Sequence, residues 1–98
     1  MNETIRTLQT TSLFNRSLKN HVGRDKKRLY CVIETLLRLV ENPRDPMLET
    51  HALRGAKKGM LSCSCGYDCR IIFRIELGTK PNTENIFLLN VGTHDDVY

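Results

Sequence analysis

Two segments in the first half of the chain carry apolar residues at the spacing of a helix. In the first segment these positions are three or four residues apart: Leu13, Phe14, Leu18 and Val22. This pattern predicts a helix from Ser12, a suitable N-cap residue, to about Val22, ending before Gly23. The apolar face of this helix needs a partner inside the same fold.

The second segment has the strongest helical stripe of the chain. Its apolar positions are Leu29, Val32, Ile33, Leu36, Leu37 and Val40. They predict the longest helix, which runs to Asn42 and is stopped by Pro43. Because a short basic turn after Gly23 joins the two segments, we predict an antiparallel helical hairpin with its basic residues outside.

The pattern changes in the second half to short runs rich in Ile, Phe, Val and Leu. We predict three strands, at residues 60–65, 69–77 and 85–91, joined by turns at GYD and GTKPNTE. The stretch between the helices and these strands, NPRDPMLETHALRGAKKG, has two prolines and two glycines and no sustained period, which predicts an extended loop. The opening segment around Ile5 and Leu8 predicts a short edge strand.

The predicted order is strand, helix, helix and then three antiparallel strands. This order defines an α+β fold in which an N-terminal helical hairpin packs on one face of a small, mainly antiparallel twisted sheet. The other face of the sheet is left for function. Ninety-eight residues of ordinary composition fit a single domain over residues 1–98.

Composition and charge argue against a membrane or secreted protein and favour a partner that carries negative charge. The longest apolar runs have four residues, so we expect no transmembrane segment, and the N-terminus lacks the pattern of a secretion signal. We therefore expect a cytoplasmic protein with mostly reduced cysteines. The net charge is +4, and six basic residues against one acid lie between Arg16 and Arg28. Such clustering favours a polyanion as partner, although a solvated helix surface explains it as well.

Three segments together resemble a known family. THALRGAKKG, GYDCRIIFRIE and the C-terminal IFLLNVGTHDDVY follow a basic helical hairpin in an order and spacing similar to the RelE/ParE superfamily of toxins. The resemblance covers nearly the whole chain and is strongest to the YafQ-like ribonuclease branch. Its most specific piece is GTHDDVY after an apolar strand. It implies a RelE-like fold.

The resemblance also implies a function and a site. It implies a toxin of a type II toxin–antitoxin system, an endoribonuclease that cuts messenger RNA in the ribosomal decoding site and is held inactive by an antitoxin. The positions that match the catalytic set of the branch are His51, Asp68, His94 and Tyr98, with Arg70 beside the scissile phosphate. Where the branch often has a further histidine in the second strand, this chain has Ser64, so we expect less efficient acid–base catalysis.

The same residues suit the chemistry of RNA cleavage by the 2′-hydroxyl. The reaction needs a base for the hydroxyl proton, an acid for the departing 5′-oxygen and cations for the charged phosphorane. We assign the acid to His94, because an imidazole titrates near neutral pH. His51 or Asp68 is the base, and the sequence leaves this choice open. Arg70 offers a fork of donors to phosphate, and Tyr98 can stack on a base.

Further basic residues are expected to contact RNA: Arg54, Lys57, Lys58 and Arg74. Arg70 and Arg74 alternate with Ile71, Phe73 and Ile75, which places both arginines on one face of the sheet. That face is either solvated or turned toward RNA. His21 lies near the end of the first predicted helix and matches no catalytic residue of the family. We interpret it as a positive charge at the helix C-terminus.

The cysteines allow two interpretations. Cys63, Cys65 and Cys69 could bind zinc together with His51, but the spacing C-x-C-x3-C is not that of a zinc knuckle. Ordinary packing is favoured, with Cys63 and Cys65 on one face of the sheet and Cys31 in the apolar second helix. We expect no metal and no other cofactor, since the 2′-hydroxyl mechanism needs none.

Two alternatives to the nuclease remain at the level of the sequence. The first is a ParE-like inhibitor of a topoisomerase (gyrase), which shares the fold and does not need the histidines. The second is a weakly active RNA-binding homologue, suggested by Ser64 in place of a histidine. The partners expected for the leading function are the cognate antitoxin, which suits the positive charge if it is acidic, together with mRNA and the ribosome.

Overall fold

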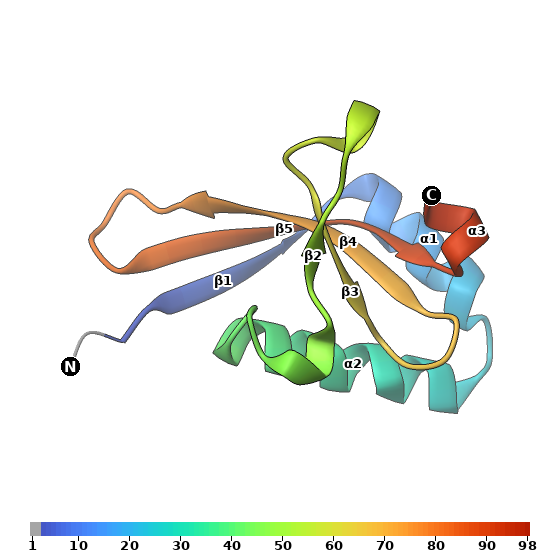
Figure 1. Ribbon diagram of the computed structural model, residues 1–98. Coiled ribbons are helices and arrows are strands. Elements are labelled where there is room, and N and C mark those ends of the chain that lie inside the picture. Colours follow the sequence, from blue (N-terminus) through green and yellow to red (C-terminus); the bar gives the residue numbers. More distant parts are fainter. Residues whose placement is uncertain (1–2) are drawn as a thin grey trace.

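The computed structural model describes residues 3–98, which form one sheet with helices packed on it (Figure 1). Its elements in chain order are β1 (Ile5–Thr10), α1 (Ser12–Val22), α2 (Lys26–Glu41), the 3-10 turn η1 (Pro46–Leu48), β2 (His51–Ala52), the 3-10 turn η2 (Gly55–Lys57), β3 (Leu61–Ser64), β4 (Arg70–Leu77), β5 (Thr83–Gly92) and α3 (His94–Val97). The predicted α+β class and the order of the main elements are confirmed.

The sheet has five strands in the order β1-β5-β4-β3-β2. β1 runs parallel to β5, and the other neighbours are antiparallel. The first strand therefore lies at an edge, as predicted. It is fixed there by Arg6, whose guanidinium lies 2.9 Å from the Glu84 carboxylate and also donates to the carbonyl oxygens of Val40 and Glu41 at the end of α2.

Both helices start at side-chain caps. The Thr11 hydroxyl accepts a hydrogen bond from the Phe14 N–H at 3.2 Å, so Thr11 is the N-cap of α1 and Ser12, the predicted cap, is its first residue. The Asp25 carboxylate accepts from the N–H groups of Lys27 and Arg28 and starts α2. Between the helices Gly23 has a φ of 53°, a conformation that glycine adopts at low cost and that ends α1.

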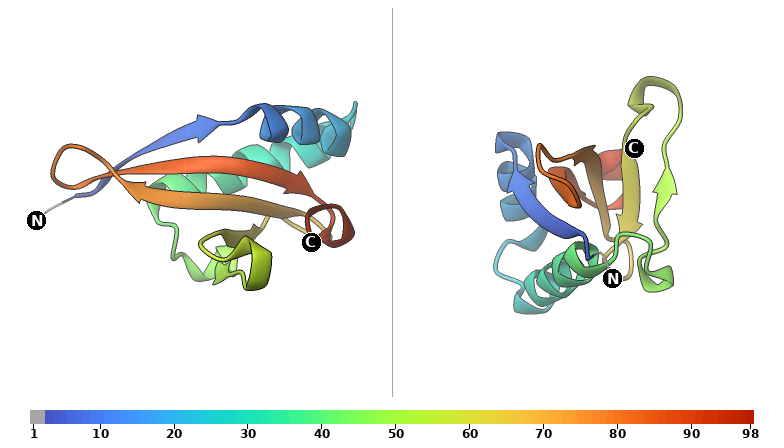
Figure 2. Two further views of the ribbon diagram at one scale, coloured as in Figure 1. Left: turned by 90° about the horizontal axis from the view of Figure 1, so that it is seen from above. Right: turned by 90° about the vertical axis from the view of Figure 1, so that its left-hand side faces the viewer.

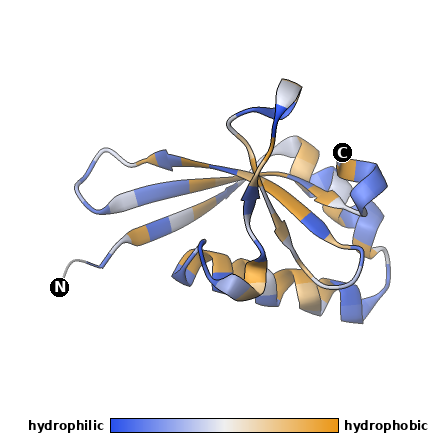
Figure 3. Cartoon of the chain, in the orientation of Figure 1, coloured by the Kyte–Doolittle hydropathy of each residue, from blue (hydrophilic) through white to orange (hydrophobic). Residues whose placement is uncertain are grey.

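The helices cover one face of the sheet, and β2 with the following loop lies at the edge farthest from β1 (Figure 2). Their buried side chains join those of the sheet in one core: Phe14, Val22, Val32, Leu39, Leu48, Cys63, Cys65, Cys69, Ile71, Phe73, Ile86, Leu88 and Val91. The hydrophobic residues in α2 and in the centre of the strands are visible in Figure 3. The predicted layer of helices on one face of the sheet is confirmed.

A β-bulge adjusts β5 to this core. Ile72 pairs with Asn90 and Phe73 with Leu88, so Leu89 has no partner in β4. The extra residue shifts the alternation of β5, which lets Val91 face the core like Leu88. β4 keeps its regular alternation, with Ile71, Phe73 and Ile75 toward the core.

The segment predicted as one extended loop is more ordered than expected. Pro46 starts a 3-10 turn that buries Leu48, and β2 then pairs with β3 through His51–Ser62 and Ala52–Leu61. The Thr50 hydroxyl donates to the Pro43 carbonyl at 2.8 Å and ties the middle of the segment to its start. A two-residue strand and one-turn helices are too short to produce a periodic pattern, which is why the sequence did not predict them.

The expectation of mostly reduced cysteines is wrong for two of the four, and the expectation of packing is wrong for Cys31. Cys65 and Cys69 form a disulfide across the β3–β4 turn, with their Cα atoms 5.0 Å apart. Cys63 is a buried free thiol in the core, as predicted, whereas Cys31 lies exposed on α2. Within residues 3–98, no three His, Cys, Asp or Glu residues are grouped as metal ligands. None of the helices in the same range is long and apolar enough to span a membrane.

Candidate functional site

Three of the five predicted catalytic residues line one open pocket at the end of the sheet. Asp68, Arg70 and His94 come from the β3–β4 turn, the start of β4 and the start of α3. The pocket has a volume of ≈ 720 Å³. Its remaining lining residues are Glu49, Ser64, Gly66, Tyr67 and Asp95. Three acidic residues, an arginine and a histidine therefore line the same space.

Asp68 is held in an unusual backbone conformation. Its φ is 48°, in the left-handed region that Asp and Asn adopt more readily than most residues. This turn directs the Asp68 carboxylate toward α3, where it accepts a hydrogen bond from the His94 N–H at 3.2 Å. The predicted turn at GYD is thus confirmed, and it connects Asp68 to the predicted acid.

The Arg70 side chain is oriented by the turn that precedes it. Its guanidinium donates to the Cys69 carbonyl at 3.0 Å and, more weakly, to the Ser64 hydroxyl at 3.4 Å. Ser64 and Arg70 are also cross-strand partners in β3 and β4. None of the described ion pairs involves Arg70, so its positive charge remains available to a phosphate.

The short helix α3 is fixed by its own cap. The Thr93 hydroxyl accepts from the Asp96 N–H, and the Asp96 carboxylate accepts from the Thr93 N–H, which is a capping box. This cap places His94 at the first helical position with its side chain 63% exposed. The His94 Nδ1 atom lies 3.6 Å from the Asp95 carboxylate, an exposed pair. The imidazole is therefore open to solvent and to a substrate.

Tyr98 connects His94 to the sheet. The two rings meet edge to face with their centroids 4.5 Å apart. The Tyr98 hydroxyl is hydrogen-bonded to the hydroxyl of Ser62, which is completely buried in β3. Because one end of the Tyr98 side chain is held by Ser62, its ring supports one side of the His94 imidazole.

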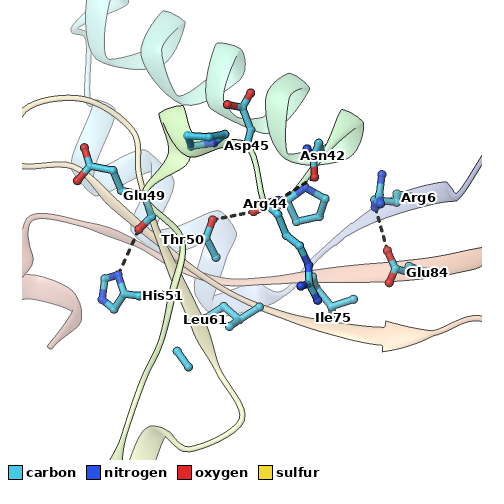
Figure 4. Close-up of a pocket in the computed structure, with 13 residues that line it drawn as sticks. Arg6, Asn42, Arg44, Asp45, Glu49, Thr50, His51, Leu61, Ile75 and Glu84 are labelled. Carbon is cyan, nitrogen blue, oxygen red and sulfur yellow. Dashed lines mark hydrogen bonds and ion pairs between the residues drawn. The ribbon is translucent and has the colours of Figure 1, made fainter.

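His51 lies outside this pocket. It belongs to β2 and lines a second pocket of ≈ 600 Å³ between β2, η1 and the end of α2, shown in Figure 4. Its Nδ1 atom lies 3.3 Å from the Glu49 carbonyl oxygen, and Glu49 lines both pockets. His51 is also the cross-strand partner of Ser62, the residue that holds Tyr98.

The other predicted RNA contacts are more dispersed. Arg70 and Arg74 share the face of β4 opposite the core, as predicted. However, Arg74 lies roughly 13 Å further along the strand, at ~3.3 Å per residue. Its guanidinium stands 5.2 Å from the centre of the Phe87 ring and 3.6 Å from the Glu76 carboxylate. The loop around η2, which projects from the sheet in Figure 1, carries the remaining basic residues: Arg54, Lys57 and Lys58. None of these four basic residues lines the pocket of Asp68, Arg70 and His94.

Two residues of the site were not predicted from the sequence. Tyr67 lines the pocket beside Asp68 and is fully exposed, and its place in the tight GYD turn was the available signal. Ser62 carried no such signal, because its role depends on Tyr98, 36 residues away.

The interpretation of His21 as a charge at the helix C-terminus is wrong. His21 is buried, and burial, followed by the nearby Arg28 charge, lowers its pKa below the ordinary value of 6.5. The Arg28 guanidinium donates a hydrogen bond to the His21 backbone carbonyl at 3.0 Å, so a cation at this helix end comes from Arg28 and not from the His21 ring. His21 is therefore a neutral side chain near pH 7.

Comparison with known proteins gives the family. No protein-family model matches the sequence, and no curated protein matches it. Among solved structures, a metal-bound toxin from Helicobacter pylori is 31% identical, with a TM-score of 0.63 over 94% of this chain and 98% of that one. The chain belongs to the RelE/ParE superfamily of type II toxins.

Two more distant structures share the fold. The YoeB/ParE toxin from Agrobacterium tumefaciens has a TM-score of 0.73 at 13% identity, over 90% of this chain and 98% of that one. The Escherichia coli DinJ–YafQ complex contains a chain with a TM-score of 0.61 at 18% identity, over 95% of this chain and 98% of that one. The resemblance to this superfamily, first noted in the sequence, is thus confirmed.

Proposed function

We propose that this toxin is a ribosome-dependent messenger RNA endonuclease that cleaves by attack of the ribose 2′-hydroxyl on the adjacent phosphate. The observation that carries the proposal is the pocket in which Asp68, Arg70 and His94 meet. It combines an imidazole, a carboxylate and a fixed cation, which are the groups that this reaction uses. No step requires a metal ion.

His94 is the general acid in this proposal. Its exposed imidazole stands at the pocket rim, supported by the Tyr98 ring, where it can give a proton to the departing 5′-oxygen. Arg70 binds the phosphate that is attacked and stabilises its developing charge. The exposed ring of Tyr67, on the turn beside Asp68, offers a surface on which an unpaired base can stack.

Two groups remain as candidates for the base that removes the 2′-hydroxyl proton. Asp68 shares the pocket with the acid, and one of its oxygens is occupied by the His94 N–H. His51 faces the neighbouring pocket, and if its Nδ1–H donates to the Glu49 carbonyl, Nε2 is free to accept a proton. With Ser64 instead of a further histidine in the pocket, we expect slow cleavage.

Recognition of the substrate extends beyond the pocket. The basic loop around η2 projects from the sheet, and Arg74 continues the Arg70 face along β4. We propose that Arg54, Lys57, Lys58 and Arg74 contact phosphates of mRNA and of the ribosome, whose backbones attract such exposed charges. A substrate on the ribosome places the toxin in the cytoplasm.

The proposed protein partner is a cognate antitoxin. Three apolar side chains on the solvent side of α2 are exposed at helical spacing: Tyr30, Ile33 and Leu37. An antitoxin segment that packs on such a stripe and carries acidic residues would also counter the net charge of +4. Of the fold relatives described above, the E. coli YafQ chain is solved together with DinJ.

Mapping the 5′ ends of a defined mRNA tests this function. The purified protein is added to naked mRNA and to mRNA on programmed ribosomes, and the new ends are tested for the 5′-hydroxyl that attack by the 2′-hydroxyl leaves. Cuts that require the ribosome and carry 5′-hydroxyls support the proposal. Cuts on naked RNA at the same rate contradict the ribosome dependence. A folded protein that makes no cuts, yet inhibits gyrase supercoiling, would establish the ParE-like alternative instead.

A further inference from the structure

The disulfide between Cys65 and Cys69 closes the turn that carries Asp68. It joins two residues that are four positions apart in the sequence, between the end of β3 and the start of β4. The Cys65 N–H also donates to the Cys69 carbonyl at 3.0 Å, and the Cys69 N–H donates to the Gly66 carbonyl at 3.3 Å. Within this ring Gly66 and Asp68 both have positive φ values, 110° and 48°. The disulfide thus restrains a conformation that the open chain adopts less readily.

The positions of both Asp68 and Arg70 depend on this turn. Asp68 lies inside it and reaches the His94 N–H, while the Cys69 carbonyl accepts the hydrogen bond that orients the Arg70 guanidinium. The Ser64 hydroxyl, a second contact of Arg70, in turn donates to the Gly66 carbonyl at 3.4 Å. A change in the turn therefore changes the positions of an acidic and a basic group of the proposed active site.

Cys65 and Cys69 are both buried, and the route by which a reagent reaches their disulfide is a pocket of ≈ 290 Å³ that they border. Cys31 of α2, Cys65, Gly66 and Cys69 all line this pocket. The Cys31 sulfur lies against the turn, 3.9 Å from where a Cβ atom on Gly66 would be. Cys63, by contrast, is fully buried, and burial raises the pKa of its thiol to about 12, so it stays protonated and inert. The cysteines at which exchange can occur are therefore those that line this pocket, Cys31 and the Cys65–Cys69 pair.

We propose that the Cys65–Cys69 disulfide is a reversible redox site that takes a dithiol reductant and controls the geometry of the RNA-cleaving pocket. One thiolate of the reductant attacks the sulfur of Cys65 or Cys69, forming a mixed disulfide and releasing the other cysteine, which takes up a proton. The second thiol of the reductant then attacks the mixed disulfide. Two protein thiols and one oxidised reductant result, a transfer of two electrons.

The effect on activity has a definite sign. The oxidised turn holds Asp68 and Arg70 in place, so oxidation favours cleavage and reduction opposes it. Disulfides of cytoplasmic proteins are usually transient and redox-sensing, which suits a site of this kind in a toxin that acts on mRNA. The effect on cleavage rests on the proposed nuclease function, whereas the reduction and the loosening of the turn do not.

The experiment compares oxidised and reduced protein under native conditions. After equilibration in buffers that hold a dithiol reductant, dithiothreitol, and its oxidised form at graded potentials, alkylation in denaturant counts two free thiols in the oxidised form and four in the reduced form. Hydrogen exchange at the amides of Cys65, Cys69 and His94 measures how often the turn opens. We expect reduction of the disulfide to increase these exchange rates on the order of tenfold. Cleavage on programmed ribosomes should fall on the order of 10- to 100-fold, the cost of displacing catalytic groups.

Matched variants separate the possible outcomes. The double variant Cys65→Ser/Cys69→Ser should resemble the reduced protein and ignore the redox potential, and Cys31→Ser should keep the full response. A disulfide that none of the buffers reduces, or exchange rates that do not change on reduction, overturns the redox site. Faster exchange with unchanged cleavage overturns its control of the pocket. Faster exchange in a protein that never cleaves RNA supports the redox site and rejects the nuclease function.

Discussion

The carboxylate of Asp68 accepts a hydrogen bond from the backbone N–H of His94, 26 residues further along the chain, at 3.2 Å. This contact joins the β3–β4 turn to α3 and brings the candidate acid and a candidate base to one pocket. Local backbone structure positions both residues. Asp68 has a left-handed conformation in the turn, and a capping box fixes the start of α3, where His94 lies. The site is therefore built from two short segments held against the end of the sheet.

The two candidate bases can be separated by substitution. Asp68→Asn keeps an oxygen acceptor for the His94 N–H and tolerates the left-handed conformation, so the free energy of unfolding should change by less than about 0.5 kcal/mol. His51→Ala removes an exposed side chain and should be equally mild. Whichever variant loses cleavage by about 100-fold or more identifies the base, measured as the single-turnover rate on programmed ribosomes. Full activity of both variants would exclude both assignments.

The hydrogen bond between Tyr98 and Ser62 should stabilise the fold. Tyr98→Phe leaves the buried Ser62 hydroxyl without its partner, so we expect a loss of about 1 kcal/mol in the free energy of unfolding by urea. In Ser62→Ala/Tyr98→Phe both polar groups are gone, and the loss should be smaller than the sum of the single losses. Strictly additive losses would show that the two hydroxyls do not interact. Cleavage should survive in Tyr98→Phe, because the ring against His94 remains, and fall in Tyr98→Ala.

Gly92 permits the close approach of α3 to the sheet. A Cβ atom at this position would lie 2.8 Å from the Asp96 Cβ, closer than such atoms pack. Gly92→Ala should push away the helix that carries His94 and lower the free energy of unfolding by about 1–3 kcal/mol, with a matching loss of cleavage. Urea denaturation and the cleavage assay measure both effects. Unchanged stability would mean that α3 can shift without cost.

How much of this architecture could be predicted from the sequence depended on the length of each element. The stripes of α1 and α2 and the runs of β4 and β5 are long enough to show their periods, and the sequence predicted all four. β2 has two residues and α3 has four, so neither produces a period. The sequence feature that indicates α3 is the capping pair Thr93 and Asp96, at the spacing of a capping box.

The candidate site was predictable only through the family resemblance. Asp68, Arg70 and His94 do lie together, but composition and spacing alone gave each a simpler explanation. The resemblance did not show that His51 faces a separate pocket or that Arg74 pairs with Glu76 and Phe87. The disulfide was missed because cysteine spacing says nothing of the turn geometry that brings Cys65 and Cys69 together.

The buried His21 predicts a pH dependence of stability. Burial and Arg28 lower its pKa in the folded protein, against a smaller opposing effect of Asp96 and Asp68. Below about pH 6.5 the unfolded chain binds a proton that the native protein does not, so the free energy of unfolding falls as the pH drops toward the native pKa. In His21→Gln the decrease between about pH 7.5 and pH 5.5 should be shallower, as measured by urea denaturation. An equally steep decrease would contradict the neutral, buried state of His21.

His94 is the residue on which the proposed RNA cleavage depends most directly. The most direct test measures the single-turnover cleavage rate of mRNA on programmed ribosomes for the native protein and for His94→Ala, with circular dichroism and thermal unfolding as checks of the fold. His94 is exposed, so the variant should unfold at nearly the same temperature while its cleavage rate falls by about 100-fold to 10,000-fold. A folded His94→Ala protein that cuts at the native rate would contradict the account.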